Sequence, residues 1–246
     1  MRAFGAGHDF IVRLLHNRAL SRLVDNRLVP RARLTLLPGS GVDLQRFNPS
    51  LRQPHGNSFR FLYAGRMLAD KGLHELIAAM RQLHSQGHDA VLWLCGFADV
   101  SNVSAITTAQ LQAWGEERFI EWLGPTDVIE QVLAQVDCVV LPSYREGLPR
   151  SLLEAGAMGL PVVATDVPGC RHVVQHGVNG LLCEVRDAVA LERAMGAVLA
   201  MAPEERVVMG AAGRRVVEET FSEDVVVEAT LGAVRRVAAV AAPGLG

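Results

Sequence analysis

Residues 137–166 decide the fold, and they read DCVVLPSYREGLPRSLLEAGAMGLPVVATD. Val139–Leu141 and Val162–Ala164 are uninterrupted apolar runs, which is typical of strands buried on both faces of a sheet. Between them, Pro149–Met158 has a helical pattern and begins with proline, a residue favoured in the first turn of a helix. Strand, helix and strand in this order predict a crossover unit with parallel strands.

The same alternation continues on both sides of this unit. We expect further strands at Leu34–Leu37, Phe59–Ala64, Ala90–Cys95, Phe119–Leu123 and Gly180–Cys183. Further helices are expected at Asp70–Gln86, Ala105–Trp114, Asp127–Gln135 and Arg171–Gln175, and near 187–201, 203–219 and 222–240. The predicted fold class is α/β, with a Rossmann-like parallel sheet flanked by helices. Ligands of such folds bind beyond the carboxyl ends of the strands.

The composition is that of an ordinary globular protein. Half of the 246 residues are apolar and a fifth are charged, which excludes a disordered chain. No apolar run approaches the roughly 18 residues of a membrane span, and charges come too early for a signal peptide. The four cysteines contain no C-x-x-C spacing and are interpreted as reduced thiols. These features predict a cytoplasmic protein.

Positive charge is concentrated in the first quarter of the chain. Residues 1–60 hold ten arginines and three aspartates, whereas the whole chain carries −2. A basic segment can face nucleic acid, an anionic membrane surface or an acidic partner, but a solvated helix face is the interpretation we favour. Nucleic acid is not expected, because no binding motif or aromatic platform accompanies the arginines. Lys71 is the single lysine among 24 basic residues.

That lysine lies in the loop after the strand at Phe59–Ala64. The loop offers Gly65, which lets a backbone approach a ligand closely, then Arg66, and then Lys71 near a helix start. An arginine fork, a lysine point charge and a helix N-terminus together suit a diphosphate. The alternative is a solvated arginine beside a helix-start lysine. The loop is not a P-loop, because G-x-x-x-x-G-K-[ST] is absent.

Two glutamates flank the start of the helix at Pro149–Met158. Glu146 lies in the preceding turn and Glu154 lies inside the helix. A carboxylate accepts two hydrogen bonds side by side, so Glu154 could hold both hydroxyls of a ribose and Glu146 those of a second sugar. The helix N–H groups would then face the phosphates between them. Alternatively, both carboxylates only favour the helix dipole.

In combination these motifs resemble the family-four glycosyltransferases, which are retaining enzymes of the two-domain "GT-B" architecture. The resemblance covers residues 33–240, and the spacing of Glu146 and Glu154 matches the E-x7-E donor signature of that family. Four segments carry it: Gly39-Ser40-Gly41-Val42-Asp43 with Phe47, Gly65-Arg66 with Lys71-Gly72, Glu146-Gly147-Leu148-Pro149 with Glu154, and Gly156 with Gly159–Gly169.

The resemblance implies a role for each matching residue. Arg66, Lys71 and Glu146 would be catalytic, with Arg66 and Lys71 on the donor diphosphate and Glu146 at the donor sugar. The donor-binding residues would be Gly65, Arg66, Lys71, Pro125, Thr126, Glu146, Gly147, Leu148, Arg150, Ser151 and Glu154. The donor would be a nucleoside-diphosphate sugar, with UDP as the expected nucleotide. No cofactor and no metal site are expected.

Two features depart from the family pattern. His172 stands where a glutamate is usual, and only about 35 residues precede the match, whereas family members begin with an acceptor-binding domain. We therefore expect that this domain is largely missing, or that a partner chain supplies it. The expected division is a helical segment at 1–32, a nucleotide-sugar-binding domain at 33–221, and a helix and tail at 222–246.

The first segment is expected to be an amphipathic helix with apolar and basic faces. Such a strip would be covered by self-association, by a partner domain or by peripheral contact with an anionic membrane at its inner face. Its apolar residues are Phe10, Ile11, Leu14, Leu15, Leu20 and Leu23.

The predicted function is retaining glycosyl transfer from a nucleoside-diphosphate sugar, in polysaccharide or glycoconjugate synthesis. The alternative is a catalytically inactive nucleotide-sugar-binding fragment or subunit, and a third interpretation is a sugar-nucleotide epimerase of the same architecture. Without an acceptor domain, the isolated chain is expected to transfer little sugar. An NAD site is not expected, because the Gly-x-Gly pairs lack a third glycine.

Overall fold

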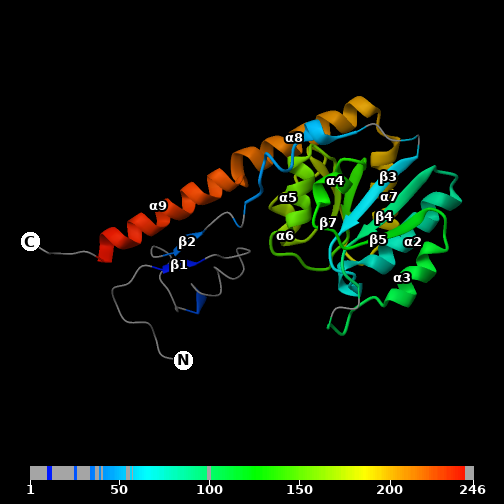
Figure 1. The fold of residues 1–246 in the computed structure, drawn as a ribbon, viewed down its shortest axis with the longest axis horizontal. Helices are drawn as coiled ribbons and strands as arrows, with labels where there is room; N and C mark the ends of the chain where they lie inside the picture. The colour runs from blue at the N-terminus through cyan, green and yellow to red at the C-terminus, as the bar shows by residue number, and fades with distance from the viewer. Residues whose placement is uncertain are drawn as a thin grey trace, which may run out of the picture.

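The centre of the fold is a parallel sheet of six strands in the order β5-β4-β3-β6-β7-β8 (Figure 1). The computed structural model describes residues 10–12, 25–26, 34–36, 39, 41–53, 56, 58–98 and 101–241. The six strands are β3 (Phe59–Ala64), β4 (Ala90–Cys95), β5 (Ile120–Gly124), β6 (Cys138–Leu141), β7 (Val162–Thr165) and β8 (Gly180–Cys183). The α/β class and the Rossmann-like parallel sheet are confirmed.

β6 and β7, the two strands within residues 137–166, lie side by side near the middle of the sheet. Val139 pairs with Val162 and Val140 with Val163, and every residue of β6 and β7 is buried. Helices therefore cover both faces, as the uninterrupted apolar runs predict.

Helices pack on both sides of the sheet, and the order in which the strands are added reverses at the centre of the sheet. α2 contacts α7 on one face, whereas α5 contacts α8 on the other (Figure 1). From β3 the chain proceeds outward to β4 and β5, whereas from β6 it proceeds the opposite way to β7 and β8. The boundary between β3 and β6 is thus a topological switch point, where ligands of open α/β sheets bind.

The helices are α2 (Leu73–Ser85), α3 (Thr108–Gly115), α4 (Ile129–Leu133), α5 (Arg150–Ala157), α6 (Pro168–Arg171), α7 (Ala188–Ala200), α8 (Pro203–Thr220) and α9 (Glu223–Ala241), with 3-10 turns η2 (Pro49–Leu51) and η3 (Ala69–Lys71).

The segment before β3 is tied to the segment between α8 and α9. The N–H of Val42 donates to the Phe221 carbonyl, and the N–H of Glu223 donates to the Val42 carbonyl. Arg214 of α8 donates to the Phe47 carbonyl at 2.7 Å and to the Ala157 carbonyl at 2.6 Å. The part of the chain that enters the six-stranded domain therefore lies alongside the part that leaves it.

The structure corrects the expectations for the N-terminal part. Residues Phe10–Val12, expected within a helix, form strand β1, which pairs in parallel with β2 (Leu34–Leu36). An aromatic and β-branched run favours a strand once a partner strand is available. β2 was expected in the domain 33–221, but it pairs with β1 in a sheet of its own. Leu14, Leu15, Leu20 and Leu23 of the predicted amphipathic helix lie outside the described residues.

A second correction concerns the short helix before β8. The prediction placed it at Arg171–Gln175, but α6 occupies Pro168–Arg171. Proline at the first helical position has a fixed φ and no N–H to satisfy, so the helix begins there.

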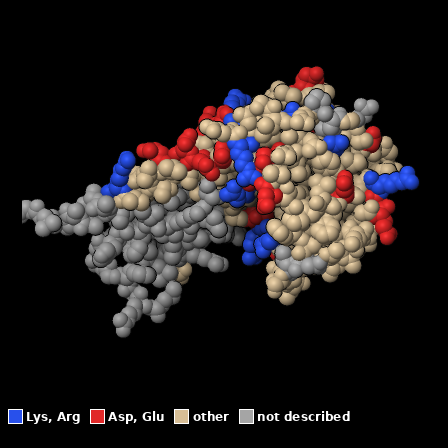
Figure 2. Space-filling model, viewed as in Figure 1, with Lys and Arg blue, Asp and Glu red and all other residues tan. Residues whose placement is uncertain are grey.

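Helix α9 leaves the six-stranded domain and contacts β1 (Figure 1). Acidic side chains gather over the junction of α8 and α9, where Glu223 and Asp224 form the first turn of α9 (Figure 2). Among the described residues, no helix combines the length and the hydropathy that a membrane crossing requires.

Candidate functional site

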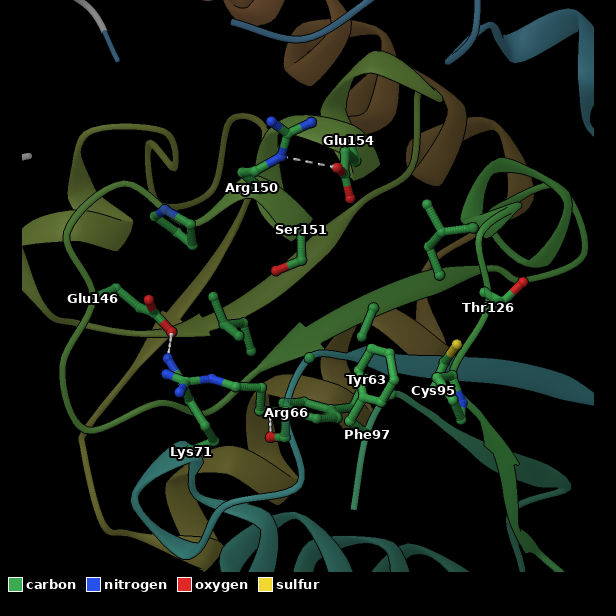
Figure 3. A pocket seen from close by; sticks show the side chains of 17 residues that line it. Tyr63, Arg66, Lys71, Cys95, Phe97, Thr126, Glu146, Arg150, Ser151 and Glu154 are labelled. Atoms are coloured by element: carbon green, nitrogen blue, oxygen red, sulfur yellow. Dashed lines mark hydrogen bonds and ion pairs between the residues drawn. The ribbon is translucent and has the colours of Figure 1, made fainter. Parts of the chain in front are cut away.

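A cavity of about 630 Å³ lies at the carboxyl ends of the central strands, where the loops after β3, β4, β5 and β6 meet (Figure 3). Its volume falls within the usual range for small-molecule sites. It is lined by Tyr63, Ala64, Gly65, Arg66, Lys71, Cys95, Gly96, Phe97, Pro125, Thr126, Ile129, Leu141, Glu146, Pro149, Arg150, Ser151 and Glu154.

The loop after β3 is held through its backbone, so the side chains of Arg66 and Lys71 are available to line the cavity. The Tyr63 hydroxyl donates to the Arg66 carbonyl at 2.8 Å, and the Gly65 N–H donates to the Cys95 carbonyl at 2.9 Å. Burial raises the pKa of Tyr63, with Glu146 as the next cause, so the hydroxyl stays a donor. The Arg66 side chain is exposed, and its guanidinium forms no hydrogen bond or ion pair with another described residue.

Two glycines let the loops approach one another closely. Gly96 has a φ of +148°, and a Cβ there would lie 1.8 Å from the Gly65 carbonyl oxygen. Gly72 has a φ of +73°, and a Cβ there would lie 2.1 Å from the Pro142 carbonyl oxygen. Neither position accepts a side chain without moving backbone, so both glycines are required for the loops after β3, β4 and β6 to form one wall.

Lys71 and Glu146 form an ion pair at one end of the cavity. The Lys71 Nζ lies 2.6 Å from the Glu146 Oε1, and the two side chains are only 19% and 13% exposed. Figure 3 shows Arg66, Lys71 and Glu146 gathered at this end. The ammonium has two further donors, so it can bind an anion while it keeps Glu146 in place.

The first turn of α5 forms the adjoining wall. Pro149 occupies the N-cap position, and the N-terminal N–H groups of the helix carry the positive end of its dipole. Glu154 lies one turn further along, with its Oε1 3.3 Å from the Arg150 Nε. Burial raises the pKa of Glu154, and Arg150 acts in the opposite direction. Ser151 points into the cavity between the two carboxylates (Figure 3).

The opposite end of the cavity is less charged. It is formed by Cys95 at the end of β4, by Phe97 after that strand, and by Thr126 and Ile129 after β5. Phe97 is 62% exposed, which is unusual for a ring of that size. Burial raises the pKa of Cys95, so its thiol stays neutral. A flat apolar ligand group fits this end better than an anion does.

Arg46 holds the loop after β5 from outside. Its guanidinium donates to the Asp127 carbonyl at 2.7 Å and to the Glu130 Oε2 at 2.9 Å. This contact connects the segment before β3 with one wall of the cavity.

Most of the residues predicted from the sequence line this cavity. They are Gly65, Arg66, Lys71, Pro125, Thr126, Glu146, Arg150, Ser151 and Glu154. Gly147 and Leu148 are not among the lining residues. A Cβ on Gly39 would lie 2.2 Å from Leu148 Cδ2, so the Leu148 side chain packs toward that glycine. The roles assigned to all these residues remain predictions.

The sequence reasoning did not find the end formed by Cys95, Phe97 and Ile129. One signal was available, since Gly96 directly follows a predicted strand and a glycine there often marks a close backbone approach. Tyr63 was also missed, because it lies inside a strand whose side chains were assigned to the core.

Comparisons with known proteins agree with this geometry. Residues 58–201 match the family described as "Glycosyl transferases group 1". The glycogen synthase of Mycobacterium tuberculosis is 29% identical over 65% of this chain and 38% of its own length. The amylovoran biosynthesis glycosyltransferase AmsK of Erwinia amylovora is 32% identical over 61% of this chain and 38% of its own length. The chain thus matches about two fifths of these relatives.

A solved structure shares the fold. Anabaena HepE in complex with UDP-glucose superposes with a TM-score of 0.75 and 22% identity, over 94% of this chain and 64% of HepE.

Proposed function

This chain belongs to the group 1 glycosyl transferases, and we propose that its cavity binds a nucleoside-diphosphate sugar, the donor for glycosyl transfer with retention of configuration. The observation that carries the proposal is the meeting of Arg66, Lys71, Glu146 and Glu154 in a single cavity at the switch point of the sheet.

In this proposal the diphosphate lies against Arg66, Lys71 and the first turn of α5. The Arg66 guanidinium forms no hydrogen bond or ion pair with another described residue, and its planar fork matches phosphate oxygens. Lys71 contributes a second positive charge, and the helix N–H groups contribute further donors. These groups stabilise the negative charge that develops on the leaving diphosphate.

The remaining parts of the donor follow from the two ends of the cavity. The ribose hydroxyls donate to Glu154, and the base extends toward Phe97 and Thr126. The transferred sugar lies near Glu146, at the end where Lys71 already holds that carboxylate. The bond from the sugar C1 to the diphosphate oxygen breaks, and an acceptor hydroxyl bonds to C1 on the same face. The proton of that hydroxyl passes to the departing diphosphate oxygen.

UDP is the nucleotide we propose, with polysaccharide or glycoconjugate synthesis as the process. HepE was solved with UDP-glucose, and AmsK is named for amylovoran biosynthesis. Both statements concern those proteins and support the proposal for this chain by analogy.

Calorimetric titration of the chain with UDP, GDP and their glucose conjugates tests the proposal. We expect saturable binding that Arg66→Ala weakens strongly and that Arg118→Ala, on an exposed residue before β5, leaves unchanged. Absence of binding to all four ligands would refute it. If the donor binds but is neither hydrolysed nor transferred to any added sugar, the chain is an inactive nucleotide-sugar-binding module.

A further inference from the structure

A second cavity of about 500 Å³ adjoins the first on the other side of the Lys71 and Glu146 loops. It is lined by Asp70, Tyr144, Arg145, Val185 and Arg186. Asp70 directly precedes Lys71, and Arg145 directly precedes Glu146. The Tyr144 N–H donates to the Asp70 carbonyl at 3.0 Å, so the two loops form the partition between the cavities.

The Arg186 side chain packs on the ring of Tyr144 in this cavity. Its guanidinium lies 4.6 Å from the centroid of the Tyr144 ring, a cation–π contact. The Tyr144 hydroxyl in turn donates to the Glu75 Oε1 at 2.6 Å, which fixes the ring. Burial and Glu75 raise the pKa of Tyr144 to about 12, so this hydroxyl keeps its proton.

The backbone of Arg186 is unusual as well. Its φ is +61°, and it is the only non-glycine residue with a positive φ in the described part of the chain. Such strain tends to concentrate where a side chain must be placed for a purpose.

Arg145 supplies a second cation. It is exposed and makes no hydrogen bond or ion pair with another described residue. The charged residues that line the cavity are two arginines and one aspartate, Asp70, so its lining carries a net positive charge. Guanidinium forks match the oxygens of phosphate, whereas a carboxylate repels an anion and accepts from a hydroxyl.

We propose that this cavity is a subsite for a phosphorylated sugar, with its phosphate on Arg145 and Arg186 and a sugar hydroxyl on Asp70. Phosphate without a hydroxyl would bind more weakly because of Asp70. The binding of phosphate to the two arginines does not rest on the function proposed above.

The experiment is an NMR titration that observes arginine Nε–Hε signals in the full chain. The signals of Arg66, Arg145 and Arg186 are assigned through Arg66→Gln, Arg145→Gln and Arg186→Gln. The probes are inorganic phosphate and glucose 1-phosphate, and vesicles containing phosphatidic acid represent a lipid source of the same group. Because each signal belongs to one cavity, binding in the two cavities is measured separately.

We expect the Arg145 and Arg186 signals to shift together and to saturate, with glucose 1-phosphate binding more tightly than phosphate. Arg186→Gln should weaken this binding about tenfold, since one charge-assisted contact is lost. Arg118→Gln is the matched control, because Arg118 is exposed at the amino end of β5, on the opposite edge of the sheet. Backbone spectra of each variant establish that it is folded.

Unmoved Arg145 and Arg186 signals in a folded chain would overturn the proposal. Vesicle binding that Arg186→Gln abolishes would support the binding of phosphate by the two arginines and assign a lipid source. If the first cavity binds no nucleotide while Arg145 and Arg186 still bind phosphate, the donor function fails and this subsite stands.

Discussion

The two ion pairs of the first cavity differ in the distance between their charged atoms and in their exposure to solvent. Lys71 and Glu146 are 2.6 Å apart and both mostly buried, whereas Arg150 and Glu154 are 3.3 Å apart and Arg150 is 57% exposed. Both carboxylates lose most of their water, but only Glu146 gains a close cation in exchange. Glu146 is therefore fixed by the protein itself, whereas Glu154 keeps its acceptor capacity for a ligand.

This difference has an energetic counterpart. Burial disfavours the ionised form of a carboxylate unless a partner compensates, and the pKa of Glu154 is raised for that reason. A ligand hydroxyl that donates to Glu154 would supply the missing compensation. The buried Glu154 carboxylate would then destabilise the unbound fold and stabilise the complex with the ligand, which is a common arrangement at functional sites.

The largest effect is expected from Lys71→Ala, which removes the close pair. Affinity for a UDP-sugar should fall about a hundredfold, because the diphosphate loses a charged donor. The free energy of unfolding should fall by about 2 kcal/mol, since Glu146 is left in a partly buried place without its cation. Calorimetry and urea denaturation measure the two quantities.

The double variant Lys71→Ala/Glu146→Gln is the control for this prediction. It should recover most of the stability, because no carboxylate is left without a cation, and little of the affinity. An affinity that Lys71→Ala does not change would place the diphosphate elsewhere.

Glu154→Gln should weaken UDP binding about tenfold and leave the Lys71–Glu146 end intact. If Glu154 accepts from the ribose, wild-type protein should prefer UDP to 2′-deoxy-UDP, and this preference should disappear in Glu154→Gln. Glu116→Gln, on an exposed residue after α3, is the matched control. An undiminished preference in Glu154→Gln would mean that another group reads the ribose.

The raised pKa of Glu154 predicts a pH-dependent stability difference. In the folded protein Glu154 binds its proton at a pH where the unfolded chain has already lost it. Its contribution therefore lowers stability as pH rises from the unfolded pKa, about 4.3, through the folded pKa. Glu154→Gln should be more stable than wild type at neutral pH, and this advantage should shrink toward acid pH. Urea denaturation across that range would show a constant difference if Glu154 were not desolvated.

The smallest effect is expected from Arg150→Ala. The pair is long and its arginine is largely exposed, so the loss should be below about 1 kcal/mol. Because Arg150 lowers the pKa of Glu154, its removal should move the acid limit of UDP binding to higher pH. A destabilisation as large as that of Lys71→Ala would erase the contrast between the two pairs.

Local patterns were sufficient for much of the fold and for the charged part of the cavity. The bounds of β3, β4 and β8 agree with the expected ranges, because each strand is a mainly apolar run that is followed by a glycine or a charged residue. Arg66, Lys71 and Glu154 lie in the cavity because parallel strands bring their following loops to one edge.

What could not be predicted depends on contacts between distant segments. The position of Phe97 follows from a glycine at a φ of +148° and from a register shift between β4 and β5. The pairing of β2 with β1 depends on a partner strand that no local pattern identifies. The hold of Arg46 on the Asp127 carbonyl joins residues 81 positions apart.

Lys71 has one more consequence, which follows from its being the chain's single lysine. Its ε-amine is the one side-chain amine in the molecule, and it lies in the wall of the cavity beside Glu146. Reductive methylation with isotopically labelled formaldehyde would attach methyl groups there and at the α-amine, and would preserve the positive charge. The cavity thus contains the one side chain that this reaction labels, so a spectroscopic probe can be placed there without mutagenesis.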